Sequence, residues 1–255
     1  MTRQNASCRG VRGRLLWHAL CSCLTGCFTV SATGGAGGAG GTGGTATSTA
    51  GTHSSGSGVG AGAQLDVTSS HESSGTLVGG QGGGPFDTMC SPGDVVVGLF
   101  GWDDNNVVDA MLVHSIGIEC ARVNVSPVGN GYRVDLVSSG KLQQVGHLGA
   151  WPGGRFTDAP CPAGTAISAV AIEAHPAGYI RSFSAVCSTP RIEVTSGGVE
   201  VVVGTADPHK IELGAPSRVM PTSCSDRGWL VGLHGRFGET IDAAGMTCAG
   251  ILASR

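Results

Sequence analysis

Six cysteines divide residues 78–255 into three similar segments, and this repeat constrains the fold more than any other feature of the chain. The first cysteine of each pair opens the run CSPGDVVVGLFG, CPAGTAISAVAI or CSDRGWLVGLHG. Val113, Ile180 and Ile241 each stand seven residues before the second cysteine. Length differences fall between these anchors, where a hairpin turn tolerates insertion. The pattern predicts three copies of one strand–turn–strand unit.

The runs between the cysteines indicate strands. They are short, alternating or β-branched, and they are bounded by glycine and proline. No segment shows a sustained helical period with caps. The stretches between the copies, YRVDLVSSGKLQQVGHL and RIEVTSGGVEVVVGTADPHKIEL, are also typical of strands. Residues 78–255 are therefore predicted to form one all-β domain of about ten to twelve short strands with pseudo-threefold symmetry.

The cysteines have two alternative roles, as zinc ligands or as disulfides. Zinc sites favour close CxxC pairs, and residues 78–255 contain none. An even number of cysteines in an exported chain favours disulfides. Six cysteines allow fifteen connectivities, but the repeat favours pairing within each copy. The favoured pairs are Cys90–Cys120, Cys161–Cys187 and Cys224–Cys248, each with a structural role.

The N-terminus is typical of an export signal. A segment with three arginines precedes the apolar run LLWHALCSCL, which is too short to span a bilayer, and then LTGC at 24–27. LTGC resembles a bacterial lipobox, which implies a lipoprotein signal peptide over 1–26 and a lipid anchor at Cys27. A plain secretory signal and no signal are the alternatives. Because no aspartate follows Cys27, the outer membrane or surface of a Gram-negative cell is favoured, and otherwise secretion.

Residues 27–77 are mostly glycine, serine, threonine and alanine, and they are predicted to be a flexible linker, because they hold too little apolar surface to offset the entropy of ordering. The whole chain carries a formal charge of −3. Four of its fifteen basic residues precede Cys27. The chain from Cys27 therefore has eleven basic and eighteen acidic residues, which gives a formal charge of −7. This charge argues against a nucleic-acid partner, which requires a basic surface.

Two segments resemble jacalin-like lectins. The opening VGGQGGGPFD (78–87) is similar to their glycine-rich start, and VGLHGRFGETIDAAG (231–245) to their closing strand–loop–strand. The disulfide-framed threefold arrangement also resembles the vitelline membrane outer layer protein. Both resemblances imply a β-prism, in which three four-stranded sheets face a common axis.

The lectin resemblance also implies a sugar site. Jacalin-like lectins bind sugar in a shallow pocket between the glycine loop and a GxxxD loop, where backbone N–H groups and an aspartate hydrogen-bond the sugar hydroxyls. Glycine allows this close approach of the main chain, and an ionised carboxylate accepts strong hydrogen bonds. Carried over residue by residue, the carbohydrate-binding positions are Gly79, Gly80, Gly238, Glu239, Thr240 and Asp242.

The carboxylate of Asp242 has no equivalent in the other copies, where His114 and Arg181 take its position. This restriction favours a single site in copy three, although Asp242 could instead satisfy backbone groups in a turn. Subtracting what the copies share leaves RFGETID, residues 236–242, as the part that differs. Function is therefore expected there.

The insertion GWDDNNVVDAM in copy one is interpreted as a polar loop over Trp102–Asn106. A solvated loop is the simplest interpretation. The alternative is a ligand loop, in which Trp102 stacks on a sugar ring or the side-chain oxygens hold calcium.

No catalytic motif is present: the chain lacks GxSxG, HExxH and GxxxxGK[ST]. The histidines are scattered, so no metal site or cofactor is expected. Asp158, Glu173 and Asp242 could act as a carboxylate pair, but nothing in the sequence places two of them together. The predicted function is surface-tethered, non-catalytic carbohydrate binding, with a glycan or polysaccharide as partner and membrane contact through the lipid anchor alone. The alternatives are a structural envelope or matrix protein and, less favoured, a glycan-processing enzyme.

Overall fold

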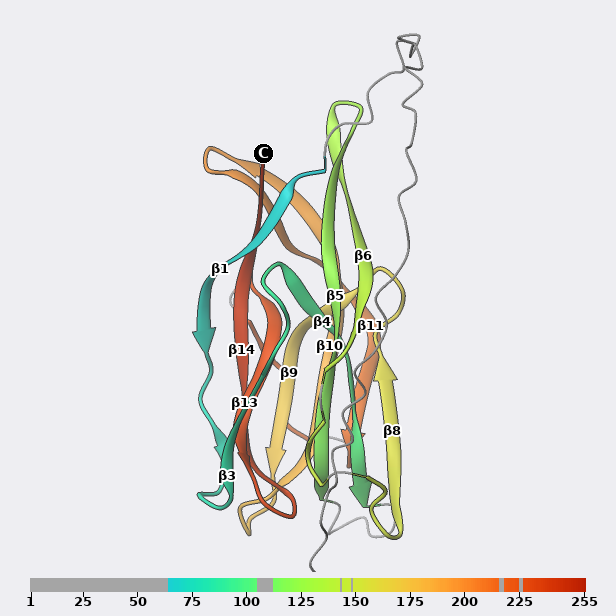
Figure 1. Ribbon diagram of the computed structural model, residues 1–255, viewed down its shortest axis with the longest axis vertical. Coiled ribbons are helices and arrows are strands. Elements are labelled where there is room, and N and C mark those ends of the chain that lie inside the picture. Colours follow the sequence, from blue (N-terminus) through green and yellow to red (C-terminus); the bar gives the residue numbers. More distant parts are fainter. Residues whose placement is uncertain (1–63, 105–111, 143, 148, 216–217, 225–226) are drawn as a thin grey trace, which may run out of the picture. The chain divides into compact units, whose positions relative to one another are not determined.

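The computed structural model describes residues 64–104, 112–142, 144–147, 149–215, 218–224 and 227–255. The expected signal peptide, the lipid anchor Cys27 and the expected linker up to residue 63 lie outside them. Across the described ranges all regular structure is β (Figure 1). Those ranges contain no helix of the length and apolar character needed to cross a membrane.

Each cysteine-framed copy forms one antiparallel hairpin. The second strand of each hairpin begins at Val113, Ile180 or Ile241, and all three side chains are fully buried. The repeated anchor is therefore the start of the same strand in each copy. The hairpins are β4 (Asp94–Asp104) with β5 (Val113–Val128), β9 (Ala166–Ala174) with β10 (Ile180–Thr195), and β13 (Trp229–Phe237) with β14 (Ile241–Ser254).

Further strands widen each hairpin into a four-stranded sheet. The first strand of each hairpin pairs with a short strand that precedes a first cysteine: β8 (Gly154–Pro160) on β4, β12 (Thr222–Ser223) on β9, and β3 (Gly84–Met89) on β13. The second strand pairs along its other edge with β6 (Gly131–Lys141) and β7 (Val145–Gly146) in copy one, β11 (Gly198–Gly214) in copy two, and β1 (Asp66–Ser74) and β2 (Val78–Gly79) in copy three. The same layout three times over is the predicted β-prism.

The expected linker boundary at residue 77 is wrong, because β1 lies inside 27–77 and pairs with β14 from Asp66–Ser254 to Ser74–Thr247. Copies one and two take their return strands from residues that follow them, whereas copy three takes its own from residues that precede copy one. The ladder uses backbone groups, so a serine-rich segment can supply it. Leu65 is also part of the fold: it is 4% exposed and its N–H donates to the Val125 carbonyl at 3.0 Å.

The inner faces of the sheets form a shared core. Leu99, Phe183 and Leu233, one from each copy, are at most 1% exposed. Burying such side chains contributes roughly 1.5–3 kcal/mol each. The disulfides join the strands around this core with the pairing that the repeat favoured: Cys90–Cys120, Cys161–Cys187 and Cys224–Cys248. These six cysteines are therefore bonded to each other and are not metal ligands.

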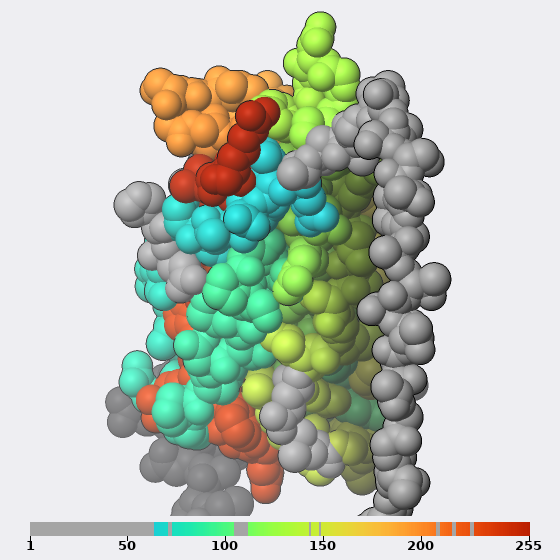
Figure 2. Space-filling model, turned by 45° about the horizontal axis from the view of Figure 1, so that its top comes forward, coloured from blue at the N-terminus to red at the C-terminus, as the bar shows by residue number. Residues whose placement is uncertain are grey.

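The two ends of the domain differ. In Figure 1 the turns between the hairpin strands of copies two and three, and the glycine-rich segment before β3, lie at the lower end. Figure 2 shows the other end, where the tips of the β5–β6 and β10–β11 hairpins stand on either side of β1 and the C-terminal residues. There Val199–Val201 of β11 pairs with β14 and joins the sheets of copies two and three.

Candidate functional site

The glycine segment and the GxxxD loop lie side by side. Gly79 on β2 pairs with Ala243 on β14, and the N–H of Gly80 donates to the carbonyl oxygen of Asp242 at 2.8 Å. The segments are about 160 residues apart in sequence, and the antiparallel pairing of β2 with β14 brings them together. The residues carried over from the lectin resemblance therefore form one contiguous surface.

Three glycines of this surface make room for the Asp242 carboxylate. A Cβ atom at Gly83 would lie 2.5 Å from Asp242 Oδ2, and a Cβ atom at Gly82 would lie 3.2 Å from the same oxygen. At Gly238 the corresponding distance is 3.4 Å. Gly83 also has a φ of +64°, which side-chain-bearing residues rarely adopt. The main chain can lie this close to the carboxylate because these positions lack side chains.

The carboxylate of Asp242 is largely enclosed. Asp242 is 8% exposed, and the hydroxyl of Thr240 donates to its Oδ1 across a long 3.5 Å. Gly238 and Glu239 are exposed, and so are Gly82 and Gly83. Exposed backbone therefore surrounds a carboxylate that is itself nearly buried. Support of the turn by Asp242, the alternative interpretation, is compatible with the same contacts.

Arg236 holds the glycine segment in place. Its Nε donates to the carbonyl oxygen of Gly82 and its Nη2 to that of Gly83, each at 2.7 Å. The planar guanidinium suits this two-point contact, which fixes the backbone beside Asp242. The sequence placed Arg236 inside the distinctive stretch RFGETID but gave it no role. The only available signal was that the equivalent residue of copy one is an aromatic, Trp102.

The other two copies support the site from either side. The carbonyl oxygen of Gly178, in the β9–β10 turn, accepts a second 2.8 Å hydrogen bond from the Gly80 N–H. Tyr179 follows it and is 39% exposed. From copy one, His114 Nδ1 lies 3.4 Å from the carbonyl oxygen of Glu239. The surface around Asp242 is therefore built from all three copies.

The conformation of Gly79 is a property of the scaffold. Gly79, Gly146 and Gly214 all have positive φ, at 118°, 94° and 89°. In each copy the next residue donates its N–H to the carbonyl at the position of Asp242: Gly80 to Asp242, His147 to His114, and Ala215 to Arg181. The features specific to copy three are the Asp242 carboxylate, the glycines around it and Arg236.

The side chain at the position of Asp242 is paired differently in each copy. His114 Nε2 lies 2.7 Å from Asp104 Oδ1, and the ring stacks on Trp151 at 3.7 Å between centroids. Arg181 pairs with Glu173 at 3.7 Å. Asp242 instead faces glycine backbone and the Thr240 hydroxyl, an arrangement that the other two copies lack.

The expected loop at Trp102–Asn106 is wrong for its first three residues, which belong to β4. Asp103 is fully buried, and its Oδ2 accepts hydrogen bonds from Arg155 at 3.0 Å, Thr157 at 3.1 Å and the Gly214 N–H at 3.0 Å. This carboxylate ties copy one to copy two. Asn105 and Asn106 lie outside the described residues. Within the described ranges no cluster of three or more His, Cys, Asp or Glu residues is placed to hold a metal ion.

The carboxylates considered for catalysis lie in different sheets. Asp158 is on β8 and pairs with Lys141, whereas Glu173 is on β9 and pairs with Arg181. Asp242 is on β14. Each of the first two is matched by a cation of its own sheet, which suits a structural ion pair better than an acid–base couple.

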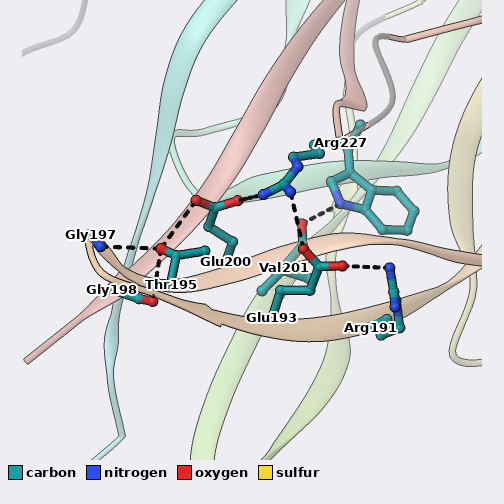
Figure 3. Close-up of polar contacts among 9 residues, drawn as sticks. Arg191, Glu193, Thr195, Gly197, Gly198, Glu200, Val201 and Arg227 are labelled. Carbon is teal, nitrogen blue, oxygen red and sulfur yellow. Dashed lines mark hydrogen bonds and ion pairs between the residues drawn. The ribbon is translucent and has the colours of Figure 1, made fainter.

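A second polar cluster lies near the tip of the β10–β11 hairpin (Figure 3). Arg227 Nη1 lies 2.7 Å from a Glu200 oxygen and its Nη2 lies 3.4 Å from Glu193, which also pairs with Arg191 at 2.6 Å. The hydrogen bond to Glu200, and then the charge of Glu193, raise the pKa of Arg227 above its ordinary value. The charges of the two arginines and two glutamates cancel. Through Arg227, the cluster links the β10–β11 hairpin to the segment before β13.

No protein-family model matches this chain, and no curated protein sequence matches it. Solved structures that resemble it include lectins. A Malaysian banana lectin is 16% identical over 70% of this chain and 98% of its own, with a TM-score of 0.37. Calystegia sepium agglutinin is 12% identical over 69% of this chain and 97% of its own, with a TM-score of 0.37. A mannose-specific jacalin-related lectin from Morus nigra is 16% identical over 71% of this chain and 96% of its own, with a TM-score of 0.35. Likenesses this distant carry no argument about what this chain binds.

Proposed function

We propose that the domain binds carbohydrate without catalysis, at the surface formed by Asp242 and the glycine segment 79–83. The observation that carries this proposal is the enclosure of the Asp242 carboxylate by Gly82, Gly83 and Gly238. A carboxylate edge beside exposed main chain presents an acceptor for a pair of sugar hydroxyls and backbone groups within reach of the same ring. No other polar group at this position of the repeat is presented in this way.

The chemistry of the surface suits a neutral hydroxylated ligand. Arg236 already donates hydrogen bonds to carbonyl oxygens of the glycine segment, so these donors do not bind an anionic ligand. The remaining contacts are a carboxylate, a threonine hydroxyl and exposed glycine backbone. This set of acceptors and donors fits vicinal hydroxyls better than a phosphate, a sulfate or an apolar group.

A glycan array with the full chain tests the proposal. Asp242→Asn keeps the shape of the side chain and removes its charge, and it should lower the signal for every bound glycan by roughly tenfold or more, because hydrogen bonds to charged groups are the strong ones. Asp135→Asn is the matched control, since Asp135 is an exposed aspartate on β6 with 45% of its side chain accessible. If no glycan binds and Asp242→Asn only lowers stability, Asp242 is a turn support and the domain is a structural module.

We also propose that the chain is exported and tethered through Cys27. The three disulfides support export, because such bonds persist in oxidising compartments. Labelling with a radioactive fatty acid in a bacterial host should mark the wild type but not Cys27→Ala. Equal labelling of both proteins, or of neither, would show that Cys27 is not a lipid anchor.

A further inference from the structure

The outward face of the copy-one sheet carries three neighbouring aromatic rings. Trp102 on β4 pairs with Phe156 on β8, and their ring centroids lie 5.4 Å apart. The Phe100 and Phe156 centroids lie 6.4 Å apart. Phe156 is 45% exposed. Trp102 is half-buried and Phe100 is only 7% exposed, so Phe156 and Trp102 supply the accessible part of this group of rings. Aromatic residues make up only 5% of the chain, so three neighbouring rings on the outer side of one sheet are a concentration that requires a reason.

The backbone beneath these rings is shaped to hold them. Phe100 lies opposite Gly117, where a Cβ atom would come within 2.3 Å of the ring. The ring therefore lies across the sheet, and the Lys141 ammonium stands 5.2 Å from its centroid. Lys141 also pairs with Asp158, and the two side chains are 41% and 46% exposed. The aromatic patch thus has an accessible donor and an accessible acceptor at its rim.

The other copies show which part of this arrangement is scaffold. In copy three the residue at the position of Phe100 is His234, which lies over Gly245 in the same way, since a Cβ there would be 2.7 Å from the imidazole. A glycine under an outward ring is therefore shared by two copies. The residues equivalent to Phe100 and Trp102 are His234 and Arg236 in copy three and Ala171 and Glu173 in copy two.

Three of these four equivalents are occupied with structural tasks. Arg236 holds the glycine segment, Glu173 pairs with Arg181, and His234 lies 3.1 Å from the Thr247 hydroxyl. Trp102 and Phe156 contact each other and solvent on the outer side of the sheet, away from both core clusters. Once the shared scaffold is subtracted, the aromatic surface is what distinguishes copy one.

We propose that this aromatic face, formed by Phe100, Trp102 and Phe156, is a second carbohydrate-binding surface that takes a neutral polysaccharide chain. The C–H face of a pyranose stacks on an aromatic ring, and the Lys141–Asp158 pair can donate to and accept from its hydroxyls. The pair has no net charge, so it does not select a charged polymer.

The inference rests on the proposed function for its ligand class, but it uses different residues. Asp242 lies near the start of β14 in copy three, whereas the aromatic face lies on the outer side of the copy-one sheet, near the end of β4 and the start of β8. A polymer that contacts both surfaces would gain avidity, whereas a single sugar residue would reach one of them at a time.

The test measures binding of the full chain to insoluble cellulose and chitin, and to soluble dextran and mannan by affinity electrophoresis. Phe156→Ala and Trp102→Ala should each weaken binding to the bound polysaccharide by roughly two- to tenfold, which is the range for loss of one aromatic contact. Met220→Ala is the control, because Met220 is an 81% exposed apolar residue outside the face. Near-ultraviolet circular dichroism verifies that each variant is folded.

The result separates the two surfaces. Two independent sites are supported if Phe156→Ala and Trp102→Ala lose polysaccharide binding but still bind the array glycans. Asp242→Asn should then lose the array glycans but still bind the polysaccharide. If both aromatic variants bind polysaccharide like the wild type while Asp242→Asn does not, the aromatic face is not a sugar surface and the proposed function stands. If no polysaccharide binds but Phe156→Ala abolishes self-association in solution, the face is an interface between copies and the inference is overturned.

Discussion

The Arg236 guanidinium donates through Nε to the carbonyl oxygen of Gly82 at 2.7 Å, and this contact fixes the glycine segment beside Asp242. Arg236→Lys keeps the charge but cannot make the planar two-point contact with Gly82 and Gly83. We expect glycan affinity to fall while the unfolding midpoint changes little, because Arg236 is near the surface. Titration calorimetry with a glycan from the array measures the first quantity and denaturant unfolding the second. Unchanged affinity would mean that the segment holds its shape without Arg236.

Gly83→Ala tests whether the backbone must lie close to the carboxylate. The new Cβ would lie 2.2 Å from the carbonyl oxygen of Phe237 and 2.5 Å from Asp242 Oδ2, at a φ of +64°. We expect a loss of roughly 1–3 kcal/mol in the free energy of unfolding, from left-handed backbone strain, and loss of glycan binding in the protein that still folds. Gly84→Ala is the matched control, because a Cβ there has nothing within 4 Å. Equal effects at both positions would contradict the account.

Gly146→Ala tests whether the positive-φ glycine of copy one stabilises the fold without contributing to the sugar site. A Cβ at Gly146 would lie 2.3 Å from the carbonyl oxygen of His114, at a φ of +94°, just as Gly79 approaches Asp242. The substitution should therefore lower the thermal unfolding midpoint without changing the glycan affinity of the folded protein. A selective loss of affinity would show that the copy-one glycine belongs to the site.

The disulfides should contribute almost equally to stability. Their loops span 30, 26 and 24 residues, so the chain-entropy model gives roughly 3–4 kcal/mol for each and a difference of only about 0.2 kcal/mol between the longest and the shortest. Replacing each cysteine pair by alanine and measuring urea unfolding compares them. A loss much larger for one pair would show that the threefold repeat does not extend to energetics.

Much of the scaffold follows from the sequence because the repeat is carried by local signals. Cysteine spacing predicted the disulfides, and the repeat predicted three strand–turn–strand units; in the structure its shared anchors Val113, Ile180 and Ile241 each begin a strand. The adjacency of Gly79 and Asp242 was implied by the resemblance to lectins and is what the structure has.

The features that the sequence did not reveal depend on contacts between distant segments. Strand β1 is polar and pairs through its backbone with residues about 180 positions away. Its sequence therefore lacks the alternation of apolar residues from which a strand is predicted. Asp103 was expected in a polar loop, but it is buried within β4, where its Oδ2 accepts hydrogen bonds from Arg155 and the Gly214 N–H. The role of Arg236 depends on a glycine segment more than 150 residues earlier.

Titration calorimetry of wild type and Asp242→Asn, with the glycan that gives the strongest array signal, tests the central claim most directly. The account predicts that wild type binds with a stoichiometry of one at the Asp242 surface. It predicts at least a roughly tenfold weaker affinity for Asp242→Asn, with Asp135→Asn unchanged. Equal affinity in wild type and folded Asp242→Asn would contradict the claim that the enclosed carboxylate of copy three is the sugar site.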